Sequence, residues 1–175
     1  QKIVKPSLPL AGGPVPFELG TTVIANSLST KIWEYPPLTL LSDGPGQKAD
    51  RGDLKGNAGT IENTLRSFGI EARVKEVNKG PAVTQYALEI AQGTKISKIT
   101  SLSNDLALAL AAPTGQIRIE APIPGRSLVG IEIPNRSLEF VTLKHMLSSD
   151  NMQNAKNKTT VSLGLDVAGM PLVST

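Results

Sequence analysis

The 175-residue sequence predicts an α+β domain, with one mainly antiparallel sheet and helices packed against it. Two stretches, 54–68 and 96–112, carry apolar residues at helical spacing. Two others, 70–90 and 117–133, alternate apolar and polar residues in paired runs that are joined by Gly/Pro-rich turns. A short helical pattern at 142–147 completes the predicted order helix, strand, strand, helix, strand, strand, helix.

The helical stretches have recognisable ends. In the first, apolar residues recur at spacings of four, three, four and three, and Gly69 stands where a left-handed C-terminal cap is expected. In the second, a helical pattern starts at Ile96. Ser103 is then expected to cap an Ala-rich helix that runs to Ala112 and ends before Pro113.

The first strand pair is expected at 70–75 and 83–90, with the turn at Asn78-Lys79-Gly80-Pro81. Along its second strand, Tyr86 lies on one face and Gln85 on the other. Tyr86 and Phe140 are both interpreted as core residues.

The second pair, 117–121 and 129–133, flanks a turn built on Pro122, Pro124 and Gly125, where pairing must stop because proline lacks the N–H that a ladder needs. The acidic residues of this pair, Glu120 and Glu132, are expected to pair with Arg118 or Arg126.

The flanks differ from this pattern. Residues 1–53 are rich in Pro and Gly and are predicted to be an irregular linker or extended arm, with one short strand at Thr21–Ile24. Apolar side chains of 31–41 are expected to dock onto the domain, with a partner-binding strip as the alternative. Residues 151–158 are polar, and 161–171 predict a strand and a turn that open a new unit.

Composition narrows the function. The net charge of +3 is spread evenly, so no basic block stands out, and the absence of Cys removes disulfides and thiolate chemistry. His145 is the single histidine and is interpreted as a surface or satisfied helical residue. No Gly-x-x-x-x-Gly-Lys-Ser/Thr phosphate loop occurs, so this piece shows no means of hydrolysing a nucleotide. The tripeptide Arg51-Gly52-Asp53 is interpreted as a chance match to an integrin-binding motif.

Several basic residues could meet a nucleic-acid backbone without reading sequence. Each is as readily a solvated surface charge, and aromatic stacking platforms are lacking. The candidates are Lys79, Lys95, Lys98, Arg118, Arg126 and Arg136.

Longer motifs carry the interpretation further. The segments Arg118–Gly125 and Val129–Asn135 closely resemble the segment ahead of the motor in the FtsK/SpoIIIE family of bacterial DNA translocases. Matching motifs precede them in the family's order, among them Val77-Asn78-Lys79-Gly80-Pro81 and Asp105 to Ala111. The resemblance covers roughly 33–173 and is densest over 69–136.

The resemblance implies that residues 54–150 are the alpha domain of the motor, preceded by linker and followed at 151–175 by the connection and first strand of a RecA-like domain. The chain would then be a non-catalytic piece of a longer protein, the cytoplasmic part of a bacterial inner-membrane protein. ATP and Mg would bind in the motor domain beyond it. Six motors would form a hexameric ring around double-stranded DNA and pump it during chromosome segregation at cell division.

Two positions depart from the family's pattern: Gln85 stands where Arg is usual, and Leu165 where Lys is frequent. A stand-alone α+β nucleic-acid-binding module is the alternative function. The DNA-facing or interface candidates are Lys95, Lys98, Arg118, Pro122, Pro124, Arg126 and Arg136, although prolines that shape a connection need no partner.

Overall fold

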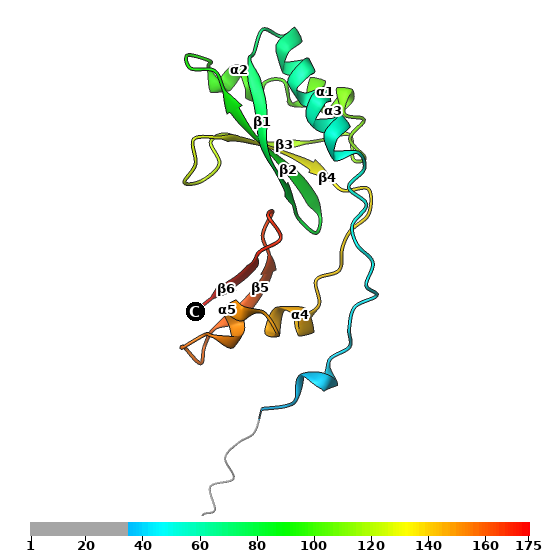
Figure 1. Cartoon of the computed structure of the whole chain (residues 1–175), viewed down its shortest axis with the longest axis vertical. Helices are drawn as coiled ribbons and strands as arrows, with labels where there is room; N and C mark the ends of the chain where they lie inside the picture. Colours follow the sequence, from blue (N-terminus) through cyan, green and yellow to red (C-terminus); the bar gives the residue numbers. More distant parts are fainter. Residues whose placement is uncertain (1–34) are drawn as a thin grey trace, which may run out of the picture. The chain divides into compact units, whose positions relative to one another are not determined.

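The computed structural model describes residues 35–175 (Figure 1). Contacts divide the chain into two units after Pro37, and every described helix and strand lies in the second, Leu38–Thr175. The strand expected at Thr21–Ile24 lies outside the described residues.

One four-stranded antiparallel sheet forms the centre of the domain, in the order β1-β2-β4-β3. The strands are β1 (Ala72–Lys79), β2 (Val83–Ile90), β3 (Arg118–Glu120) and β4 (Val129–Pro134). In the register between the two central strands, Tyr86 lies opposite Ile131 and Gln85 opposite Glu132. Side chains alternate between faces along a strand, so this register gives the sheet one apolar and one polar face. The predicted α+β class is confirmed.

Helices cover the apolar face (Figure 1). They are α1 (Leu54–Ser67), α2 (Ile96–Thr100) and α3 (Ser103–Ala109). The core joins Ile61 and Leu65 of α1, Leu106 of α3, and Tyr86 and Ile131 of the sheet, all of them fully buried. The predicted core position of Tyr86 is therefore correct.

The second helical stretch differs from the prediction at both ends. Leu102, not Ser103, is the N-cap of α3, because buried Leu102 occupies the junction between α2 and α3. The helix ends at Ala109 rather than Ala112, since Ala111 adopts φ 47° and the Ala112 N–H bonds back to the carbonyl of Ala107. A left-handed residue of this kind terminates a helix.

Two further expectations are corrected. Strand β1 continues past residue 75 to Lys79 through a bulge between Val74 and Glu76. Phe140 is 67% exposed, because it lies in the irregular segment after β4 rather than on the sheet. In the stretch 31–41, Tyr35 and Leu40 are about three-quarters exposed and Leu38 and Leu41 are partly buried, while residues 31–34 lie outside the described residues.

The C-terminal part contains two short helices, α4 (Leu143–Leu147) and α5 (Asp150–Gln153). They are followed by a hairpin of β5 (Val161–Leu165) and β6 (Pro171–Ser174). The short helix at 142–147 and the strand after 160 were predicted, whereas α5 falls partly in a segment expected to be irregular. The 3-10 helix itself, η1 (Leu38–Leu40), lies in the arm.

Candidate functional site

A polar row crosses the face of the sheet that the helices leave uncovered. Asn78 of β1 donates to the Gln85 side-chain oxygen at 3.1 Å, and the Gln85 amide nitrogen donates to Glu132 at 3.2 Å. The guanidinium of Arg118 reaches the same Glu132 carboxylate at 3.4 Å, and the Gln85 nitrogen also lies 3.3 Å from Glu120. Gln85 and Glu132 are only 2% and 5% exposed. Both of these buried side chains have hydrogen-bond partners, as buried polar groups in folded proteins usually do.

The connection between β3 and β4 folds back over this polar face. The Ala121–Pro122 peptide is cis, and the Ile123 side chain is buried against Gly130, where a β-carbon would come within 3.1 Å of it. The turn is held by the Ile123 N–H, which donates to the carbonyl of Leu128 at 2.8 Å. Pro122 and Pro124 themselves are exposed. The predicted proline-shaped connection is therefore a flap on the polar face.

At the end of this flap, Arg126 forms an ion pair with Glu76 of β1. The hydrogen bond from Arg126 lowers the pKa of the Glu76 carboxyl, and the same bond raises the pKa of Arg126. Arg118 pairs with Glu120 and Glu132 as expected, but Arg126 does not, because the flap carries it across to β1. Two guanidinium groups thus face three carboxylates, and this face carries no surplus positive charge.

The other basic candidates lie elsewhere. Lys95 is the N-cap of α2, and the Lys98 ammonium lies beside Gly69 at the end of α1. Arg136 follows β4, with its guanidinium next to Gly52. These three and Lys79, the last residue of β1, are exposed, and none of the four forms an ion pair within residues 35–175. The structure brings Arg118, Pro122, Pro124 and Arg126 together and leaves the remaining candidates apart from them.

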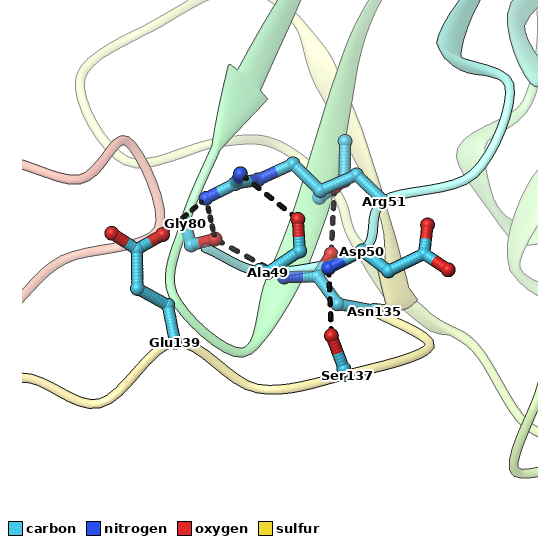
Figure 2. Close-up of polar contacts among 8 residues, drawn as sticks. Ala49, Asp50, Arg51, Gly80, Asn135, Ser137 and Glu139 are labelled. Atoms are coloured by element: carbon cyan, nitrogen blue, oxygen red, sulfur yellow. Dashed lines mark hydrogen bonds and ion pairs between the residues drawn. The ribbon is translucent and has the colours of Figure 1, made fainter. Parts of the chain in front are cut away.

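A second polar cluster, which sequence analysis missed, joins the arm to the sheet (Figure 2). We call it the clasp; it consists of Ala49, Asp50, Arg51, Gly80, Asn135, Ser137 and Glu139. Its centre is Arg51, whose guanidinium donates to the Gly80 carbonyl at 3.0 Å, to Glu139 at 2.9 Å and to the Ala49 carbonyl at 3.3 Å. The hydrogen bond that Arg51 donates to Glu139 lowers the pKa of the Glu139 carboxyl.

Backbone and amide contacts complete the clasp. Asn135 is 8% exposed; it donates to the Gly80 carbonyl at 3.1 Å and accepts from Thr84 at 2.8 Å. The Asp50 N–H donates to the Ser137 hydroxyl at 2.8 Å, and its carbonyl accepts from the Arg136 N–H at 2.8 Å. Residues 87 and 88 positions apart in the chain are thus paired directly beside the turn between β1 and β2.

The clasp explains the Arg51-Gly52-Asp53 tripeptide. The Arg51 side chain is 18% exposed within the clasp, and the Asp53 carboxylate caps α1 by accepting from the N–H groups of Lys55 and Gly56. Gly52 between them adopts φ 63°, a left-handed conformation that favours glycine. All three residues have structural roles. A sequence signal existed in the Gly80 turn and the Asp53 cap, but nothing in the spacing pairs Arg51 with Glu139.

The tip of the β5–β6 hairpin lies against the same turn. A β-carbon on Gly80 would come within 3.0 Å of the Val167 carbonyl oxygen, and one on Gly169 within 3.1 Å of the Lys79 carbonyl oxygen. Two backbones approach closely here because both positions lack side chains. The tip is closed by Asp166, whose carboxylate accepts from the N–H groups of Ala168 and Met170 at 2.8 Å.

The described part of the chain contains neither a cluster of metal ligands nor a helix that could span a membrane. Between Tyr35 and Thr175, no group of three His, Asp or Glu side chains is placed to hold a metal ion. No helix in that same part of the chain is long and apolar enough to cross a bilayer.

Comparison with known proteins shows which family shares this part of the chain. A family model described as the FtsK alpha domain matches residues 35–135, which include the turn between β1 and β2, the polar row and the flap. The chain belongs to the FtsK alpha-domain family.

Relatives of this alpha domain support the assignment. The chain is 47% identical over 149 residues to a protein named DNA translocase FtsK from Staphylococcus aureus (strain Mu50), a match over 85% of the chain and 18% of that protein. It is 44% identical over 160 residues to DNA translocase FtsK of Clostridium tetani, over 90% of the chain and 21% of the relative. The chain therefore spans about a fifth of the length of these relatives.

Proposed function

We propose that this chain is the non-catalytic alpha domain of an ATP-driven double-stranded DNA translocase, and that it helps six motor subunits to form a ring around the duplex. The observation that carries the proposal is the family match over residues 35–135 together with relatives named DNA translocase FtsK. Chromosome segregation at cell division is the process in which such a pump would act.

The proposal divides labour between this chain and the rest of its parent protein. ATP and Mg would bind in a RecA-like domain that follows residue 175, and residues 151–175 would lead into it. The parent would be anchored in the bacterial inner membrane, with this domain on the cytoplasmic side. The alpha domain would supply a rigid body against which the motor domain moves.

Charge distribution favours particular residues for any contact with the duplex. Arg118 and Arg126 are neutralised by carboxylates of the same domain, so a phosphate would have to displace an existing partner. Lys95, Lys98 and Arg136 have no ion-pair partner within the described residues and are exposed. We assign backbone contacts, which carry no sequence information, to these three.

Translocation by the parent protein tests the proposal. A parent in which residues 54–137 are replaced by a flexible Gly/Ser segment should still bind ATP but should lose displacement of a third strand from a DNA triplex. Unimpaired displacement by that variant would overturn the proposal.

A binding titration tests the alternative, a stand-alone nucleic-acid-binding module. Fluorescence anisotropy of the 175-residue chain with duplex DNA, at low and moderate salt, should show weak association that moderate salt abolishes. Tight binding by this chain alone would instead favour the stand-alone module.

A further inference from the structure

The turn between β1 and β2 is enclosed by three segments that are far apart in sequence. The arm reaches it through Arg51, the segment after β4 through Asn135 and Glu139, and the β5–β6 hairpin through Gly169. In Figure 2 the side chains of Arg51 and Asn135 converge on the carbonyl of Gly80. The Gly80 carbonyl therefore accepts hydrogen bonds from both Arg51 and Asn135, and the tip of the β5–β6 hairpin packs against the backbone beside it.

From this arrangement we infer that Arg51 is a positioning residue, which couples the arm to the β5–β6 hairpin by fixing the turn on which the hairpin tip rests. Residues 49–51 of the arm then act as a strap of the domain rather than as a passive tether. Under the proposed function, the strap would make the seat of the motor's first hairpin depend on the state of the arm.

Gly80 is the residue through which Arg51 would act on the hairpin. Lys79 and Gly80 supply the surface that the hairpin tip contacts, and Gly80 is also the acceptor for Arg51. Without the guanidinium, the turn keeps the bonds that Asn135 donates to it and the bond from the Glu139 N–H to the Pro81 carbonyl, but it loses the side-chain donor that ties Gly80 to the arm. A turn with fewer restraints samples more conformations, and close backbone packing at Gly80 and Gly169 tolerates little displacement.

The hairpin depends on such a seat. A two-stranded hairpin alone is marginally stable in water. This hairpin also contacts α4 and α5, but its side chains Val161, Leu163 and Leu172 remain exposed and add little packing. Loss of the seat should therefore be visible as faster opening of the hairpin itself.

Amide hydrogen exchange of the 175-residue chain tests the inference. In Arg51→Ala, exchange of the Asp166 N–H, which donates to the Met170 carbonyl, should accelerate about tenfold or more. The N–H groups of Leu106 in α3 and of Leu110, the C-cap of that helix, should keep their wild-type exchange. Arg66→Ala is the matched control, because Arg66 is exposed and bonds to Asn63 of its own helix.

A second variant approaches the contact from the hairpin. Coupling is reciprocal, so Gly169→Ala should accelerate exchange of the Arg136 N–H, which donates to Asp50. Gly164→Ala is its control: Gly164 also adopts a positive φ, but a β-carbon there meets nothing within 4 Å. This variant leaves Arg51 and its partners intact, so it remains informative if Arg51→Ala folds poorly.

Two outcomes would overturn the inference. Faster exchange confined to residues 135–139 in Arg51→Ala, with the hairpin unchanged, would make Arg51 a local anchor of the arm. Equal acceleration in α3 and in the hairpin would make its role one of general stability. Neither result depends on translocation, so the proposed function can stand or fall separately.

Discussion

The side-chain amide of Gln85 donates to the Glu132 carboxylate at 3.2 Å, at the centre of the polar face of the sheet. Both residues are almost completely buried, on the two central strands and opposite each other in register. The family resemblance predicts Arg at position 85, where this chain has Gln. The structure shows what an Arg would meet there: the carboxylates of both Glu132 and Glu120.

The effect of replacing Gln85 on stability should therefore depend on whether the new side chain can donate to these carboxylates. Gln85→Leu leaves the buried Glu132 short of a donor and should lower the free energy of unfolding by about 1–3 kcal/mol. Gln85→Arg should be at least as stable as the wild type, because a guanidinium can donate to both carboxylates. Urea unfolding measures both, with exposed Gln92→Leu as the control. Unchanged stability of Gln85→Leu would contradict this account.

The salt dependence of DNA binding by the parent protein should distinguish basic side chains that already have an ion-pair partner from those that have none within the described residues. Each phosphate contact contributes about 0.9 to the slope of log K against log salt concentration. Lys95→Gln combined with Lys98→Gln should reduce the slope by about 1.8 if both residues contact the backbone. Arg126→Gln should leave the slope unchanged, because Arg126 is already engaged by Glu76. A slope that responds to Arg126 but not to the two lysines would reverse the assignment.

The Arg51–Glu139 pair should give the clasp a defined pH dependence. The pKa of Glu139 is depressed below its ordinary 4.5 by Arg51, so its contribution to stability is present above that value and is lost as pH falls below it. Glu139→Gln should be less stable than wild type at pH 7 by less than about 1 kcal/mol, since the pair is partly exposed.

At pH 3 the difference between the two proteins should shrink. Urea unfolding at both pH values provides the measurement, and Glu71→Gln serves as the control because Glu71 is an exposed glutamate without an ion pair within residues 35–175. A difference that widens toward pH 3 would exclude the pair as its source.

Helix α3 offers a matched pair of leucines for the core. Leu106 is fully buried against the sheet, whereas Leu108 two residues later is 83% exposed. Leu106→Ala should cost about 2–5 kcal/mol through lost burial and the cavity left behind. Leu108→Ala should change stability by no more than about 0.5 kcal/mol. Thermal unfolding followed by circular dichroism compares them, and equal losses would contradict the packing described.

Sequence patterns identify the elements better than they identify the contacts between them. The strict alternation around Tyr86 and Ile131 predicts two strands and their buried face, because period-2 patterns follow directly from strand geometry. Helix ends were less predictable: the left-handed turn at Ala111 arises at a non-glycine residue that propensity would place inside the helix.

The polar contacts depend on tertiary placement. Arg118 lies opposite Glu132 in the register of β3 and β4, and it shares one face of β3 with Glu120 two residues later, so these pairings were foreseeable. The partner of Arg126 depends on the path of the flap, and the partner of Arg51 lies 88 residues away. Neither spacing leaves a mark in a single sequence.

The pairing of Asp50 with Arg136 and Ser137 has a mechanical consequence. The chain enters and leaves the sheet domain at one point, so tension between the arm and the segment after Glu139 acts first on the Asp50 and Arg51 contacts. These contacts then carry the force, and it is not transmitted along the strands of the four-stranded sheet. A domain fastened in this way can be pulled from both ends and keep its hydrophobic core unstretched.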